Sequence, residues 1–109
     1  MWRMAACLAL ICGSVSAQDR VDLDGSGIRA ALDGQKLVYG SGAWQEFRVS
    51  ARTLYNAGQD SWGDWRVEGD LYCSLWPPSD LWACFGMQRA GDRLRFLDSN
   101  GEITEGRVE

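Results

Sequence analysis

The sequence predicts a small, mainly β domain, either an antiparallel meander or a curled barrel of six to eight strands, with a short N-terminal helix. From residue 36 onward, apolar and polar residues alternate in short segments, which is typical of half-buried strands. Turn signals such as Gly69-Asp70, Gly91-Asp92 and Asn100-Gly101 recur about every ten residues. So short a chain favours a sheet that curls strongly or closes into a barrel.

The helix is predicted over residues 26–32, after a polar and loose segment at residues 18–24. Ser26 is expected to cap this helix, Ile28 and Leu32 lie on one of its faces, and Gly34 ends it. We expect the helix to cover one open end or one face of the sheet. The predicted strands span residues 36–39, 43–49, 53–55, 62–68, 71–76, 82–89, 93–97 and 102–107.

Residues 1–17 are predicted to be a secretory signal peptide, which leaves residues 18–109 as a single mature domain. Arg3 supplies the positive start, and the apolar stretch over residues 4–12 is shorter than the ~20 residues that span a bilayer. Val15-Ser16-Ala17 fits the small-residue rule for signal peptidase cleavage, which would then occur before Gln18. Neither Cys7 nor Cys12 has the neighbouring residues of a lipoprotein signal. We therefore expect a periplasmic or secreted protein with no stable membrane insertion after the signal is removed.

Cys73 and Cys84 are the cysteines that remain after this cleavage. An even pair in an exported protein predicts a disulfide, and neighbouring strands joined by the Pro77-Pro78 corner would bring the two residues nearly opposite each other. A structural zinc site needs four ligands, and the chain has no histidine. A redox pair usually has the spacing C-x-x-C. A structural disulfide is therefore the prediction, with no metal and no cofactor.

The segment "GDWRVEGDLYCSLWPPSDLWACFGMQRAGDRLRFLDSNG" resembles an uncharacterised family of small exported alphaproteobacterial proteins. The shared pattern is a Gly-x-Trp strand, a Gly-Asp turn, a Cys followed by Trp-Pro-Pro, and a Trp-x-Cys. The preceding "LDGSGIRAALDG" fits the same layout. The resemblance covers most of the mature chain and implies an exported β domain, but it implies no activity and no catalytic residue.

The charge balance argues against two classes of partner. The mature chain keeps 10 Lys and Arg residues against 15 Asp and Glu, and Lys36 is its only lysine. An acidic domain of this kind is a poor match for nucleic acid, which needs a basic stripe, and for an anionic lipid surface.

Two acidic patterns resemble chemical sites. The spacing Asp22-x-Asp24-x-Ser26-Gly27, with Asp33 twelfth, copies part of a calcium-binding EF-hand loop, but Arg29 stands where an apolar residue is usual and strands follow in place of a helix. Asp64, Glu68 and Asp70 alternate as on the solvated face of a strand, although a carboxylate pair can hydrolyse glycosides. We therefore expect neither a metal site nor an enzyme, and we assign no catalytic residue.

The mature chain has five tryptophans, at positions 44, 62, 65, 76 and 82. They either pack in the core and around the disulfide, or some are exposed and bind a sugar or a partner chain. The candidate binding surface is Trp76, Pro77, Pro78 and Trp82, with Trp62 as a further candidate. The expected function is a non-catalytic binding role with an unknown protein or glycan partner. The alternatives are an inhibitor of a protease or lysozyme, with the Pro77-Pro78 corner as blocking loop, and a weak glycan-binding module.

Overall fold

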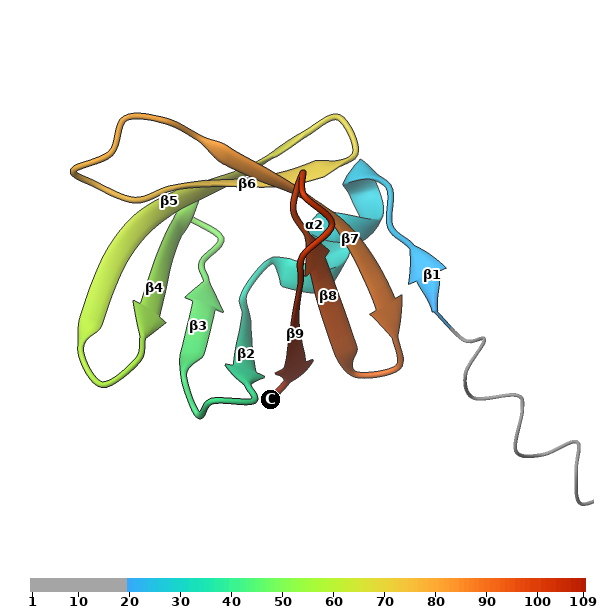
Figure 1. The fold of residues 1–109 in the computed structure, drawn as a ribbon, viewed down its shortest axis with the longest axis horizontal. Helices are drawn as coiled ribbons and strands as arrows, with labels where there is room; N and C mark the ends of the chain where they lie inside the picture. Colours follow the sequence, from blue (N-terminus) through green and yellow to red (C-terminus); the bar gives the residue numbers. More distant parts are fainter. Residues whose placement is uncertain (1–19) are drawn as a thin grey trace, which may run out of the picture.

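The computed structural model describes residues 20–109, which form a closed antiparallel β-barrel (Figure 1). Its strands are β2 (Gln35–Tyr39), β3 (Trp44–Phe47), β4 (Arg52–Asn56), β5 (Asp60–Glu68), β6 (Leu71–Leu75), β7 (Ala83–Ala90), β8 (Arg93–Leu97) and β9 (Ile103–Val108). Each strand pairs with the next along the chain, and β9 returns to pair with β2, which closes the ring. The prediction of an antiparallel meander that curls into a barrel is confirmed.

The predicted signal peptide and its cleavage site lie outside the described residues. Between residues 20 and 109, no helix has the length and apolar character needed to cross a bilayer.

A further strand, β1 (Val21–Asp22), lies beside β7, so the prediction that residues 18–24 are loose was wrong for these two residues. The pairing of β6 with β7 ends at Phe85, whereas β7 continues to Ala90. The backbone groups of β7 beyond this point would otherwise be an open strand edge, and β1 pairs with two of its residues, Gln88 and Arg89.

The helix α2 (Gly25–Leu32) closes one end of the barrel. Its N-cap is Asp24, and the prediction of Ser26 as the cap was wrong: the carboxylate of Asp24 accepts a hydrogen bond from the backbone N–H of Gly27 at 2.8 Å. This bond lowers the pKa of Asp24 below its usual value. The aspartate that resembled a calcium ligand is thus used as a helix cap.

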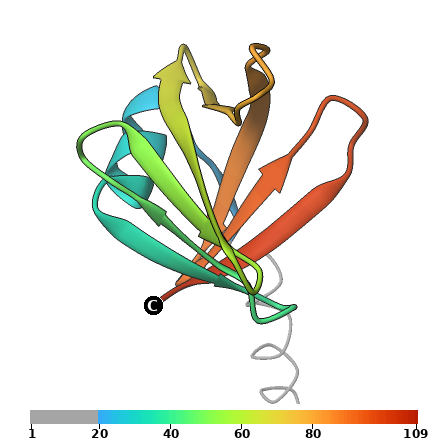
Figure 2. The same ribbon diagram turned by 90° about the vertical axis from the view of Figure 1, so that its left-hand side faces the viewer.

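The position of α2 leaves the other end of the barrel open. The backbone N–H of Gly25 donates to Oδ1 of Asp70 at 2.9 Å, which ties the start of the helix to the β5–β6 turn. In Figure 2, α2 lies on the left, whereas the β2–β3 turn and the β8–β9 loop lie on the right. The open end also carries the β4–β5 and β6–β7 loops, because successive strands of an antiparallel meander run in opposite directions.

The hydrophobic core fills the half of the barrel next to the helix. The predicted helix face is confirmed, because Ile28 and Leu32 are fully buried. They belong to a cluster in which α2 packs on inward-facing side chains of the strands. Its strand members are Leu37, Phe47, Trp65, Tyr72, Met87, Leu94 and Phe96.

Candidate functional site

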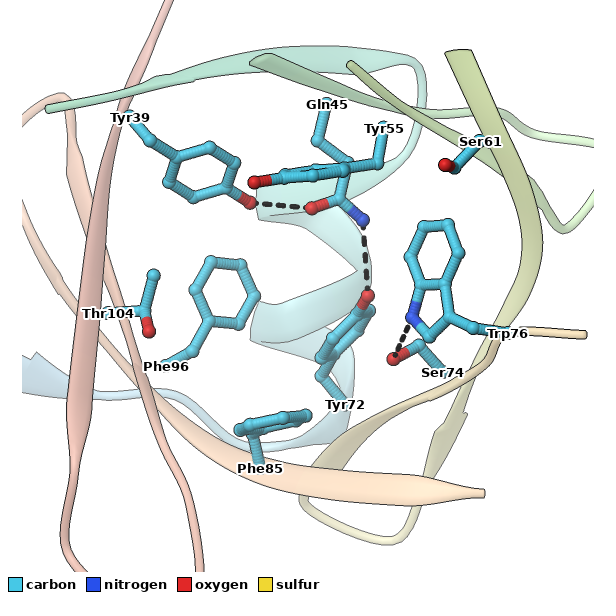
Figure 3. A pocket seen from close by; sticks show the side chains of 10 residues that line it. All are labelled: Tyr39, Gln45, Tyr55, Ser61, Tyr72, Ser74, Trp76, Phe85, Phe96 and Thr104. Carbon is cyan, nitrogen blue, oxygen red and sulfur yellow. Dashed lines mark hydrogen bonds between the residues drawn. The ribbon is translucent and has the colours of Figure 1, made fainter. Parts of the chain in front are cut away.

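The open half of the barrel contains a cavity of about 380 Å³ (Figure 3). Every strand from β2 to β9 contributes to its wall, because inward-facing side chains of adjacent strands meet at the same level. The ten lining residues are Tyr39, Gln45, Tyr55, Ser61, Tyr72, Ser74, Trp76, Phe85, Phe96 and Thr104. Eight-stranded barrels are wide enough either to be filled by side chains or to hold one small ligand.

Aromatic rings make up most of the cavity wall, in two groups. In the first, the Tyr55 ring lies 6.3 Å from that of Tyr39 and 6.2 Å from that of Trp76. In the second, the Tyr72 ring lies 5.2 Å from that of Phe96 and 6.0 Å from that of Phe85. Mutual contacts of this kind limit the freedom of each ring, so the wall is largely preformed.

Gln45 organises the polar part of the wall. Its Oε1 accepts a hydrogen bond from the Tyr39 hydroxyl at 2.7 Å, and its Nε2 donates to Oγ1 of Thr53 at 2.9 Å. Nε2 also lies 3.5 Å from the Tyr72 hydroxyl oxygen, which accepts its second hydrogen. Gln45 is buried, its oxygen accepts one hydrogen bond and both hydrogens of its amide are donated, so it holds both tyrosines in place.

Among residues 20–109, no charged side chain lines the cavity. Burial raises the pKa of Tyr72 to about 12 and also raises the pKa of Tyr39 well above its usual value, with desolvation as the largest cause in both. The two phenols therefore stay protonated at neutral pH and offer hydrogen bonds without a charge.

Two local features hold the Trp76 indole in the cavity wall. Its Nε1–H donates to Oγ of Ser74 at 3.1 Å. A Cβ atom added to Gly63 would lie 2.7 Å from the Trp76 ring and 2.6 Å from the carbonyl oxygen of Leu75. The indole therefore packs directly on the bare backbone of β5, and only glycine leaves room for it.

The structure separates the predicted binding residues. Trp76 lines the cavity, whereas Trp82 lies outside it with the Arg66 guanidinium 3.9 Å from its ring centroid. Pro77 and Pro78 are exposed in the β6–β7 loop, next to the open end. Of these four residues, Trp76 is the one that lines the cavity.

The other tryptophans are divided between core and surface. Trp65 is buried, with its Nε1–H donating to the carbonyl oxygen of Arg48. Trp44 lies beneath the ammonium group of Lys36, 4.4 Å from the ring centroid, and Trp62 remains 42% exposed.

Two of the three alternating carboxylates, those of Asp64 and Glu68, have arginine partners outside the cavity. Asp64 forms an ion pair with Arg52 at 2.9 Å, and Glu68 forms one with Arg66. Both carboxylates lie on the outer face of β5, and neither lines the cavity.

The predicted disulfide between Cys73 and Cys84 is confirmed, since the two residues are register partners on β6 and β7 and their sulfur atoms are bonded. Within the described part of the chain, the one group of potential metal ligands consists of these two cysteines and Glu68. Because both thiols are consumed by the disulfide, this group offers no thiolate to a metal.

Sequence reasoning missed most of the cavity wall, including Tyr39, Gln45, Tyr55 and Tyr72. The available signal was the alternation along each strand, which places Tyr39 on the same face as Leu37, Gln45 on the same face as Phe47, and Tyr72 on the same face as Ser74. Gly63, inside a run of otherwise large strand residues, was a second signal for a close approach to the backbone.

Comparison of the chain with protein-family models, with curated proteins and with solved structures finds no match.

Proposed function

We propose that the protein binds a small organic molecule in the open half of its barrel and does not transform it. The observation that carries this proposal is the cavity itself, lined from every strand of the barrel by aromatic rings with a few hydroxyl and amide groups among them. Concave, largely apolar sites with a few polar groups are typical of small-molecule binding.

The size of the cavity limits the ligand. At ~30 Å³ per water molecule, its volume corresponds to about a dozen waters, so it suits a molecule of about that many non-hydrogen atoms. Such a ligand would place its apolar part against the rings and exchange hydrogen bonds with hydroxyls such as those of Ser61 and Thr104 at the entrance.

The chemistry of the wall supports binding rather than catalysis. Its titratable groups are phenols, and burial raises the pKa values of Tyr39 and Tyr72 away from neutrality. General acid–base catalysis is most effective when the pKa of the catalytic group lies near the working pH.

The proposal predicts that the purified domain binds 1-aminonaphthalene, a neutral dye of suitable size whose emission shifts to the blue in apolar surroundings. Thr104→Trp should weaken this binding by about tenfold or more, because an indole at position 104 enters the cavity mouth. The measurement is a fluorescence titration in which the dye is excited at a wavelength longer than those that tryptophan absorbs. Circular dichroism shows whether the variant is folded.

Ile103→Trp is the matched control, because Ile103 precedes Thr104 on β9, is half exposed and points to the opposite face of the strand. It should bind the dye as the natural sequence does. If the natural sequence does not bind the dye, or if both variants bind it equally, the cavity is not the binding site. Displacement of the dye by simple neutral sugars would instead favour the glycan-binding alternative.

We further propose that the protein acts after export, in the periplasm or outside the cell. The disulfide supports an oxidising compartment, and the first seventeen residues have the pattern of a secretory signal. The intact mass of the exported protein should correspond to a chain that begins at Gln18 and lacks two hydrogens at its cysteines. A mass that retains residues 1–17, or that carries a lipid on Cys12, would contradict this proposal.

Inhibition of a protease or lysozyme through the Pro77-Pro78 corner stays a prediction. The feature in its favour is the exposed loop between β6 and β7, in which Leu81 is 76% exposed and Cys73 and Cys84 hold the base.

A further inference from the structure

We propose that the ligand selected by the cavity is an organic cation, such as an alkylated ammonium group that carries an apolar substituent. This inference rests on the proposed function, because it names the chemical class that the same cavity prefers. Two features support it: the ring faces inside the cavity and the charges around its mouth.

Two of the aromatic rings, those of Tyr55 and Phe85, turn a face toward the space between them (Figure 3). Figure 3 shows Tyr55 and Phe85 nearly edge-on at opposite sides of the cavity, so that one face of each ring is turned toward the ligand space. The face of an aromatic ring carries the negative part of its quadrupole and attracts cations. Quaternary ammonium groups are bound in this way by cages of several aromatic side chains.

The polar groups of the cavity can accept hydrogen bonds from a cation and do not repel it. Among residues 20–109, none of the lining side chains is basic. The hydroxyl oxygens of Tyr55, Ser61 and Thr104 can each accept a hydrogen bond from an ammonium N–H or lie beside its methyl groups.

The mouth of the cavity is acidic. The segments at the open end, residues 40–43, 57–60, 76–82 and 98–102, comprise the four loops and Asp60 at the start of β5, and they contain no lysine or arginine. They contain four carboxylates, those of Asp60, Asp80, Asp98 and Glu102. Asp60 directly precedes the lining residue Ser61, and Glu102 lies two residues before Thr104, so both are next to the entrance.

The rest of the described chain is electrically balanced. Ten of the 11 basic residues of the sequence (all except Arg3) and 14 of its 15 acidic residues (all except Asp19) lie between residues 20 and 109. Outside the mouth, ten basic side chains are therefore balanced by ten carboxylates. Many of these groups form ion pairs, such as Arg52–Asp64 and Arg95–Glu105. The net negative charge of the described domain is located at the open end, where it attracts cations and repels anions.

The test compares three ligands that share a benzyl group and differ in the charge of a tetrahedral head: benzyltrimethylammonium, its neutral carbon isostere neopentylbenzene, and the anion phenylmethanesulfonate. Their affinities are measured by displacement of 1-aminonaphthalene. The cation should bind about tenfold tighter than the neutral isostere, and the anion should bind weakest.

Two sets of variants separate the contribution of the ring faces to cation binding from the contribution of the charges at the mouth. Phe85→Leu keeps an apolar wall but removes a ring face, so it should weaken binding of the cation by about threefold or more and leave the neutral isostere nearly unchanged. Asp80→Asn with Glu102→Gln removes two mouth charges and should weaken binding of the cation, most clearly at low salt. Asp22→Asn with Asp92→Asn removes two charges at the far side of the barrel and should change little.

Each outcome decides the inference. If the neutral isostere binds as tightly as the cation while the dye still binds in the cavity, the cation preference is overturned and the proposed function stands. If none of the three ligands displaces the bound dye, the cation preference is overturned as well. If the dye itself does not bind, the proposed function fails first.

Discussion

Replacing Cys73 and Cys84 together by alanine should lower the free energy of unfolding by about 2–5 kcal/mol, the range for native disulfides of small secreted domains. The structural reason is the shortness of the β6–β7 junction. These strands share three register pairs, Tyr72 with Phe85, Cys73 with Cys84 and Ser74 with Ala83, and the disulfide is the middle one. Because domains have typically ~5–15 kcal/mol of stability, this loss is a large fraction of the total.

The same variant should also bind 1-aminonaphthalene more weakly, because Tyr72, Ser74 and Phe85 in the cavity wall flank the disulfide. Urea-induced unfolding measures the stability, and titration of thiols in the native and denatured protein checks that the natural sequence has none free. A stability loss under about 1 kcal/mol, or two reactive thiols in the native exported protein, would contradict this account of the junction.

Phe47→Ala should lower the free energy of unfolding by about 3–5 kcal/mol, as expected for truncation of a fully buried phenylalanine. Phe47 has no exposed surface, and its ring centroid lies 5.8 Å from that of Trp65, 5.7 Å from that of Tyr72 and 6.3 Å from that of Phe96. It therefore supports two residues of the cavity wall, Tyr72 and Phe96, from the side of the core.

Val49→Ala is the matched control for this prediction, because Val49 follows the same strand but is 77% exposed. Its effect should stay within about 0.5 kcal/mol. Both are measured by urea unfolding. An equal effect of the two substitutions would show that Phe47 does not pack as described.

The sequence predicted the strands well but could not assign their faces. In β3, Gln45 and Phe47 alternate with Trp44 and Glu46, so each face carries one aromatic residue and one polar residue. The structure turns Gln45 and Phe47 inward. Trp44 is compatible with the outer face because Lys36, its neighbour on β2, covers its ring. Such cross-strand contacts depend on register, which the alternation within one strand does not contain.

The cavity was not predictable for a related reason. It exists because β9 pairs with β2, and the partners Leu37 and Val108 are distant in the sequence. Without that closure the inward-facing tyrosines would form one exposed face of an open sheet. The pairing of the strands also separates Trp76 from Trp82. The chain reverses direction between the two residues, and the Trp82 ring packs against the guanidinium of Arg66 on the outer face of β5.

The location of the ligand can be measured directly in a proton–nitrogen correlation spectrum, recorded during titration with 1-aminonaphthalene. The indole N–H groups of the five mature tryptophans report on different places, and that of Trp76 is the one in the cavity wall. The account predicts that the Trp76 indole signal shifts with saturation while those of Trp62 and Trp82 do not move. Saturable shifts at Trp62 or Trp82, with the Trp76 signal unchanged, would place binding on the outer face of the barrel and contradict the central claim.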